Sequence, residues 1–329
     1  MRMAGPANQG LESIMARVNS ILLAAEREDA VHQSVNRALM LARYLDARLD
    51  ILLCDPDLPA AAGNGAASQR SAAEAREYLE ALRNSILAPD VEITTEAAFD
   101  GSLHEHVARK VRREGSSLVV KGMGRIPQAR ENHLNWQLIR ASPAPLLLTR
   151  GHPWHPRARF AAVIDGHSPR HSSIAANVGA SLQLACGADL DLIYLQGDAG
   201  ASEQAQSIAG DLHVAPDRLH ILGRDGAEVL PQFIGQRGFD LVALPTAGEP
   251  AGFGVERALA DKLTKSTDLD LLFVQQADGN RAEIAAGKTP FSLVGRSWAK
   301  ALRSGWPEGD EAASPAVTPG SLSSIPVPS

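Results

Sequence analysis

Cysteine is scarce in this sequence: only Cys54 and Cys186 occur among its 329 residues. Two cysteines cannot form a framework of several disulfides, and they cannot supply a zinc site with four cysteine ligands. We therefore expect both thiols to be reduced and buried inside the folded protein. This excludes the class of small disulfide-stabilised domains.

Long apolar runs are missing as well. A membrane-spanning helix needs about 18 or more consecutive apolar residues, and no such stretch is present. Residues 1–10 contain Arg2 but no apolar run behind it, so they do not resemble a secretory signal. The sequence therefore predicts a cytoplasmic protein that does not contact a membrane.

Positive charge is not in excess. The chain has 32 Lys and Arg against 38 Asp and Glu, which gives a net charge of −6 at pH 7. Binding to nucleic acid through the whole surface needs a basic face, so we expect no nucleic-acid partner. A small basic patch is left open as an alternative at Arg109, Lys110, Arg112 and Arg113.

Length and composition predict two globular domains. A hydrophobic fraction of 44% and a charged fraction of 21% are ordinary for a folded protein, and 329 residues are more than one hydrophobic core usually supports. We expect domains at residues 17–150 and 157–276, joined by a Pro-rich linker at 151–156. A Pro/Ser/Ala/Gly-rich tail at 277–329 is predicted to be partly disordered.

The two halves of the sequence repeat one order of predicted elements. Each opens with an apolar strand that ends at an acid, Glu26 in the first half and Asp165 in the second. An amphipathic helix follows, and then come the matching strands 49–53 and 190–194, Leu-Asp-Ile-Leu-Leu and Leu-Asp-Leu-Ile-Tyr. The later predicted strands are 91–95, 118–120 and 145–148 in the first half, and 219–222, 241–244 and 269–274 in the second.

This alternation of strands and helices predicts the fold class. It implies right-handed crossovers and a mostly parallel sheet with helices on both faces. Each half is therefore expected to be an α/β domain with a doubly wound, Rossmann-like parallel sheet. Residues 57–74 are rich in Ala, Gly, Ser and Asn and are expected to form a long loop. Glycine-containing loops are expected after the fourth strands, at 122–124 and 248–254.

The element order, the acid after the first strand and the glycine loop after the fourth strand resemble the universal stress protein family. The tandem arrangement resembles its two-domain, E-type members. A local match is the segment 135–145, Asn-Trp-Gln-Leu-Ile-Arg-Ala-Ser-Pro-Ala-Pro, which is followed by His152, Pro153 and Trp154. The resemblance covers residues 17–276 and implies an adenine nucleotide α-hydrolase-like fold.

Nucleotide-binding members of this family carry the motif Gly-x2-Gly-x9-Gly-(Ser/Thr) across the loop and the start of the next helix. In the first half, Lys121 stands in place of the first Gly and Gly124 fits the second. Asn132 and His133 fall where the late Gly and Ser would be, at a shorter spacing, and Glu26 replaces the usual Asp. The first half is therefore not expected to bind a nucleotide.

The second half keeps more of this pattern. Ligands of an open parallel sheet lie beyond the carboxyl ends of its strands, where Asp165 ends the first strand. Gly248, Gly252 and Gly254 lie in the loop after the fourth strand, whose N–H groups could bind phosphates. Pro245 replaces the first Gly and has no N–H to donate. These acid and glycine positions are the candidate residues for ATP or AMP; a plain turn and a capping acid are the alternatives.

Catalytic and metal sites are not predicted. His104 and His106 are two residues apart on a predicted helix and do not share a face. His167 and His171 flank a helix start but lack a third ligand. The nearby serines are not in a Gly-x-Ser-x-Gly elbow, so a hydrolase triad is not supported. We therefore expect no catalytic residues and no bound metal.

The expected function is that of a non-enzymatic stress-response protein with degenerate nucleotide sites. The resemblance implies that the last strands of the halves, at 146–148 and 271–273, pair within one chain; whether two chains form a homodimer is left open. The main alternative is a regulatory switch that binds ATP or AMP in the second domain. An enzyme of the wider nucleotide-binding α/β group would need a phosphate-gripping loop and a positioned base or metal. A partner-binding adaptor that uses residues 308–329 is a further alternative.

Overall fold

The computed structural model describes residues 20–25, 30–54, 66–99, 101–123, 129–166, 169–195, 201–223, 225–246 and 257–275. Within them the chain forms two halves that we treat as β1–β5 with α1–α4 and β6–β10 with α5–α8. The expected tail at 277–329 lies outside the described residues.

The first half alternates strands and helices along its whole length. Its elements are β1 (Ser20–Ala25), α1 (Ala30–Leu45), β2 (Arg48–Cys54), α2 (Ala66–Ser85), β3 (Ile93–Ala98), α3 (Leu103–Glu114), β4 (Leu118–Gly122), α4 (Ala129–Ala141) and β5 (Leu146–Thr149).

Within the described residues the second half repeats this order, with one short 3₁₀ helix before β8. Its elements are β6 (Arg159–Asp165), α5 (Pro169–Cys186), β7 (Asp189–Leu195), α6 (Ala201–Asp211), η2 (Pro216–Arg218), β8 (Leu219–Leu222), α7 (Gly226–Arg237), β9 (Leu241–Thr246), α8 (Arg257–Ser266) and β10 (Asp270–Gln275). Helix α5 ends at Cys186, and Gly187 after it adopts the left-handed conformation with φ +63° that is common just past helix ends.

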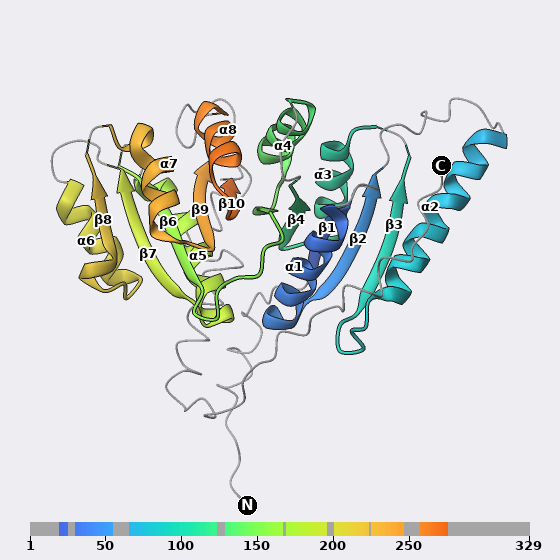
Figure 1. Cartoon of the computed structure of the whole chain (residues 1–329), viewed down its shortest axis with the longest axis horizontal. Helices are drawn as coiled ribbons and strands as arrows, with labels where there is room; N and C mark the ends of the chain where they lie inside the picture. The colour runs from blue at the N-terminus through green and yellow to red at the C-terminus, as the bar shows by residue number, and fades with distance from the viewer. Residues whose placement is uncertain are drawn as a thin grey trace, which may run out of the picture.

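All ten strands belong to one sheet, with the order β3-β2-β1-β4-β5-β10-β9-β6-β7-β8. Read from its two ends, the sheet has the same order in each half, and Figure 1 shows the halves side by side. The strands within each half are parallel, whereas β5 and β10 are antiparallel where the halves meet. This confirms the predicted fold class of a mostly parallel, Rossmann-like α/β sheet.

Helices cover both faces of the sheet. One buried apolar cluster joins the sheet to α1, α2, α5 and α6. A second cluster on the other face joins it to α3, α4, α7 and α8. The apolar runs of the central strands are buried on both sides because each face is covered, which is why they do not alternate with polar residues.

The seam between the halves is apolar. Leu147 of β5 lies opposite Leu272 of β10 in the antiparallel register. The six residues that pair across this seam are at most 1% exposed; they are Leu146, Leu147, Leu148, Leu271, Leu272 and Phe273. The last strands of the two halves are therefore neighbours inside one core.

Two expectations about secondary structure are wrong. The loop expected at 57–74 gives way to α2 from Ala66 onward, because the Ala-rich sequence has high helix propensity and its continuation buries Ala75, Leu79 and Leu82. Residues 57–65 of that loop lie outside the described residues. The third strand begins at Ile93, two residues later than expected. Among the described residues, no helix is long and apolar enough to cross a membrane.

Candidate functional site

The place where the strand order reverses in the second half lies between β6 and β9, which are parallel neighbours. The chain leaves β6 toward α5 on one face of the sheet and leaves β9 toward α8 on the other. Such a point is where open parallel sheets bind ligands. Asp165 is the last residue of β6 and Thr246 is the last residue of β9, so the fold brings these two to the same edge.

Strands β6 and β9 pair only along their N-terminal parts and separate before they reach this edge. The paired residues run from Phe160 with Leu241 to Ala162 with Ala243. Asp165 and Thr246 are each three residues beyond the last pair. By the alternation of side chains along a strand, both belong to the face that is covered by α7 and α8, because Val163 and Leu244 pack there.

Thr246 is the most informative residue at this edge. It is 7% exposed, and its hydroxyl oxygen Oγ1 is a buried polar atom without a hydrogen-bond partner in the described part of the chain. A buried hydroxyl without a partner is unfavourable by roughly 1–3 kcal/mol, so such groups usually have a ligand or water to bind. Sequence reasoning missed Thr246, because the strand was expected to end at residue 244, before Pro245, whereas β9 continues to Thr246.

Tyr194 lies beside this edge on β7, next to Ile164 of β6. Its hydroxyl donates a hydrogen bond of 3.3 Å to Gln204 Oε1 of α6. Burial raises the pKa of Tyr194, and the negative charge of Asp165 raises it further. The phenol therefore stays protonated near neutral pH and can act only as a neutral hydrogen-bonding group.

The structure does not test the glycine positions that were named from the sequence. Gly248, Gly252 and Gly254 lie outside the described residues, so their contribution stays a prediction. Pro245 is not part of a loop: it is in β9 and pairs in register with Val274 of β10. The missing N–H of this proline is tolerated because the ladder between β9 and β6 has already ended at Ala243.

The corresponding edge of the first half carries a lysine. Lys121 of β4 pairs with Ala24 of β1, is 2% exposed, and donates a hydrogen bond of 3.1 Å from Nζ to the carbonyl of Gly122. A buried ammonium group thus lies near the carboxyl end of β4, at the position that corresponds to Leu244 of β9. Glu26 and Gly124 lie outside the described residues.

The histidines named from the sequence are not brought together. His104 Nε2 lies 3.3 Å from Ser102 Oγ, whereas His106 is 8% exposed on the inner side of α3. His167 lies outside the described residues, and nothing is described of the side chain of His171. Among the described residues, no group of three or more His, Cys, Asp or Glu could hold a metal ion.

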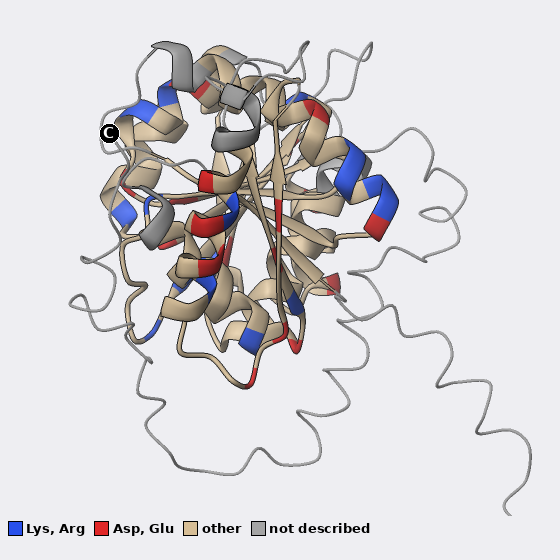
Figure 2. Ribbon diagram, turned by 90° about the vertical axis from the view of Figure 1, so that its right-hand side faces the viewer, with Lys and Arg blue, Asp and Glu red and all other residues tan. Residues whose placement is uncertain are grey.

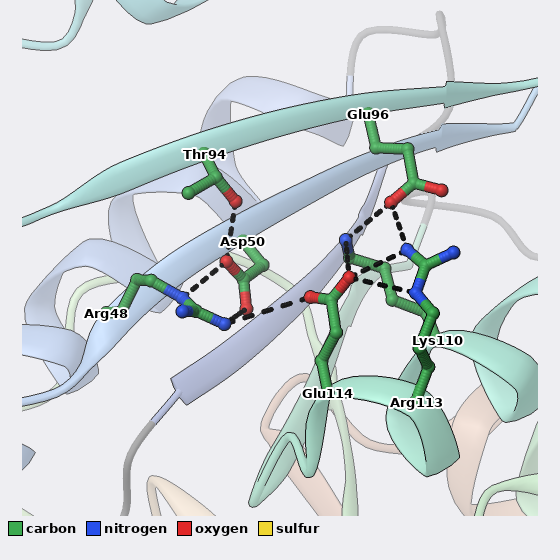
Figure 3. A network of polar contacts seen from close by, with 7 residues as sticks. All are labelled: Arg48, Asp50, Thr94, Glu96, Lys110, Arg113 and Glu114. Carbon is green, nitrogen blue, oxygen red and sulfur yellow. Dashed lines mark hydrogen bonds and ion pairs between the residues drawn. The ribbon is translucent and has the colours of Figure 1, made fainter.

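Half of the basic patch that the sequence left open on α3 is paired with acids. Lys110 Nζ lies 2.7 Å from Glu96 Oε2 and 3.1 Å from Glu114 Oε1. Arg113 Nη2 contacts the same two carboxylates at 2.8 and 2.7 Å. Figure 3 shows this network, and Figure 2 shows positive and negative charges interspersed over the helices on that side. Two of the four cations are therefore engaged by acids rather than available to a polyanion.

The network continues to a buried aspartate in the second strand. Asp50 of β2 is fully buried; it accepts hydrogen bonds from Thr94 Oγ1 at 2.6 Å and Arg48 Nη2 at 3.1 Å. Burial alone would raise the pKa values of Glu96 and Glu114, but hydrogen bonds and charges from Lys110 and Arg113 hold both below the ordinary value of a glutamate.

The matching aspartate of the second half has different polar partners. Asp191 of β7 lies 2.9 Å from Arg159 Nη2 and 2.8 Å from His220 Nε2. The Leu-Asp match between the two sequences therefore marks equivalent buried acids, each held by polar partners. This arrangement fits a structural role for both.

This chain is similar to known proteins in structure. No family model and no curated protein sequence matches this chain. A universal stress protein from Archaeoglobus fulgidus DSM 4304 is similar in structure, with a TM-score of 0.63, 10% identity, and coverage of 79% of this chain and 100% of that one. A functionally unknown protein from Pseudomonas aeruginosa PAO1 has a TM-score of 0.59, 18% identity, and coverage of 87% and 99%.

A third similar structure is a candidate universal stress protein from Pseudomonas aeruginosa UCBPP-PA14, with a TM-score of 0.58, 18% identity, and coverage of 87% and 99%. These coverages exceed what either half of the sheet could supply alone, so the likeness includes both halves. The fold of this chain is therefore that of the universal stress proteins among its structural neighbours.

Proposed function

We propose that this chain is a non-enzymatic stress-response protein of the tandem, E-type universal stress class that acts in the cytoplasm. The observation that carries the proposal is the likeness to universal stress proteins across both halves of one sheet. In this proposal the molecule acts through its folded surface, and its two halves are held together by the β5–β10 seam.

The non-enzymatic part of this proposal has a direct test. The purified chain would be incubated with ATP and Mg²⁺, and the release of phosphate, pyrophosphate and AMP would be followed together with transfer of label to protein. We expect no turnover above buffer. Turnover that is lost in an Asp165→Ala variant would overturn the proposal and indicate an enzyme.

A regulatory nucleotide site in the second half is the second candidate, and Thr246 favours it. The buried Oγ1 without a partner lies at the end of β9, and the carboxylate of Asp165 lies at the end of the adjacent β6. A carboxylate can accept hydrogen bonds from sugar hydroxyls, and the threonine hydroxyl can donate to or accept from a ligand. In this proposal Gly248, Gly252 and Gly254, which lie outside the described residues, supply N–H groups to the phosphates.

The first half fits a nucleotide less well. Lys121 lies near the end of β4, the strand that corresponds to β9, and its buried side chain already donates to the carbonyl of Gly122. Glu26 adds a methylene where the second half has Asp165. We therefore assign one regulatory site to the chain, in the second half.

Calorimetry with ATP and with AMP tests this assignment. We expect one binding site that is weakened at least about tenfold by Asp165→Ala and by Thr246→Val, which is a loss of about 1.4 kcal/mol. Asp211→Ala serves as the control, because Asp211 is an exposed acid at the end of α6. No binding up to about 1 mM nucleotide would contradict the regulatory site and leave the first proposal standing.

A further inference from the structure

A buried ion pair crosses the seam between the two halves. Arg37 of α1 places Nε 2.8 Å from Oδ2 of Asp270, the first residue of β10, and the two side chains are 4% and 3% exposed. The indole Nε1–H of Trp154 donates to the same Oδ2 at 3.0 Å. The backbone N–H of Arg150 donates to Oδ1 at 3.0 Å. Every one of these partners of a second-half carboxylate comes from the first half or from the linker.

The guanidinium group of Arg37 is fixed from several sides. It stacks over the ring of Trp154 at 3.9 Å from the ring centre and donates to the carbonyl of His152. Trp154 in turn makes an edge contact with Phe160, with ring centres 4.8 Å apart. The linker is therefore bound to both halves through the group that carries the ion pair.

The repeat shows which residues of the other half occupy the equivalent places. Leu22 of β1 pairs with Val119, which pairs with Leu146; in the second half, Ala161 pairs with Val242, which pairs with Leu271. Leu146 and Leu271 are thus equivalent, and the residue before each is Pro145 or Asp270.

The helices follow the same offset. Helix α1 begins at Ala30 and α5 begins at Pro169, so the position of Arg37 corresponds to Ala176, a buried residue of α5. Pro145 and Ala176 carry no charge. The ion pair therefore exists on one side of the seam only, although the apolar pairs around it are nearly symmetric.

We propose that the Arg37–Asp270 pair is a specificity element that selects pairing of the first half with the second half over pairing of like halves between copies. The apolar seam alone does not discriminate, because Leu or Phe would meet Leu or Phe in every arrangement. Two second halves paired through β10 would bury each Asp270 near an Ala176 instead of an Arg37. Two first halves paired through β5 would bury each Arg37 near a Pro145. A buried charge without its partner is strongly unfavourable, so both wrong arrangements are disfavoured.

A role in the specificity of pairing can be distinguished by experiment from a role in stability. Replacing both members of a buried ion pair with apolar residues of similar size often leaves a protein equally stable. Loss of specificity would instead increase the share of wrongly paired copies. The full-length double variant Arg37→Met/Asp270→Leu therefore tests the proposal, with Arg43→Met/Asp90→Leu as the matched control. The control pair also joins Arg to Asp, at 2.7 Å, but it lies within one half.

The experiment unfolds each full-length protein, refolds it at several concentrations, and measures the mass of the products by light scattering. We expect wild type and control to give the same products. The double variant should give at least tenfold more of higher-mass species, with a share that rises with protein concentration. Indistinguishable products for the double variant and the control would overturn the proposal.

A disulfide identifies which strands pair. Leu272 lies opposite Leu147 in the native seam, so a Leu272→Cys replacement finds no cysteine partner there. Two β10 strands paired about the same centre would bring residue 272 of both copies into register, at a separation that a disulfide can bridge. We expect a mapped 272–272 bond on the double-variant background and not on the control background. If the double variant does not fold, Asp270→Asn replaces it, and a lack of any 272–272 bond there also contradicts the proposal.

Discussion

Arg150 and Gln275 occupy equivalent positions at the ends of the last strands of the two halves, and each binds the last helix of the opposite half. The guanidinium group of Arg150 donates from Nη2 to the carbonyl of Thr264 in α8. Gln275 Nε2 donates to the carbonyl of Arg140 in α4 at 2.7 Å. The final carbonyls of a helix lack partners within the helix, so each half completes a helix end of the other. This exchange joins the halves through polar contacts outside the apolar seam.

The fit of the linker against α1 predicts an unusual cost for one glycine. Gly151 has φ +73°, and a Cβ there would lie 2.1 Å from Cβ of Gln33. We expect Gly151→Ala to lower the free energy of unfolding by about 2–4 kcal/mol, because it combines backbone strain with a clash. Gly115→Ala is the control, since Gly115 has φ +71° but nothing within 4 Å of its Cβ position, and it should cost about 1 kcal/mol. Equal losses in urea denaturation would show that the linker moves away freely.

A substitution at the centre of the apolar seam should lower the free energy of unfolding strongly. Leu147 is fully buried opposite Leu272. We expect Leu147→Ala to lower the free energy of unfolding by about 2–5 kcal/mol, because it leaves a cavity between the halves. Leu87→Ala should stay within about 0.5 kcal/mol, because Leu87 is 77% exposed. A small effect at Leu147 in denaturant titrations would mean that the seam adds little to stability.

The charge network on α3 predicts an acid-dependent loss of stability. Hydrogen bonds and charges from Lys110 and Arg113 lower the pKa values of Glu96 and Glu114 in the folded chain, so the unfolded chain binds protons more tightly. This contribution is present above about pH 4.5 and is lost as the pH falls through the lowered folded pKa values. Lys110→Met should cost about 1–2 kcal/mol at pH 7, and this difference from wild type should shrink on acidification.

Denaturation at a series of pH values from about 7 to about 3 measures that difference. Arg112→Met is the matched control, because Arg112 is an exposed cation on the same helix outside the network. A difference between Lys110→Met and wild type that is constant over this range would refute the assignment of the lowered pKa values to the network.

The two thiols should react only after unfolding. Burial raises the pKa of Cys186 to about 12, with a smaller opposing effect from the charge of Arg37. Cys54 is 5% exposed. Because the thiolate is the reactive form, a thiol reagent at about pH 8 should modify neither residue quickly in the native protein and both after denaturation. Rapid modification of Cys186 in the native state, located by mass spectrometry, would show that its surroundings open easily.

Most of the strands could be predicted from the sequence because their signal is local. Apolar runs such as 49–53 and 241–244 are buried, and the helical spacing between the strands is visible without any tertiary information. The loop expected at 57–74 is wrong from Ala66 onward, because small residues are common in loops but alanine also favours helices. That helix is held by Ala75 and Leu79 in the core, and their burial is a tertiary effect.

The candidate site was only partly visible in the sequence. Asp165 could be named because it ends an apolar run, which is a local pattern. Thr246 could not, because its importance comes from burial without a partner at the end of a neighbouring strand. Arg37 gave no signal either, since a single cation within a helix is ordinarily solvated.

The sequence by itself determined the order of the elements and the α/β class. These features depend on hydrophobic periodicity and on residues close together along the chain. Only the tertiary structure decided that Arg37 and Asp270, more than 200 residues apart, form a buried pair, and that Arg150 and Gln275 bind the opposite half. Such contacts form because antiparallel pairing of β5 with β10 brings distant segments together and removes water, and no local pattern encodes that.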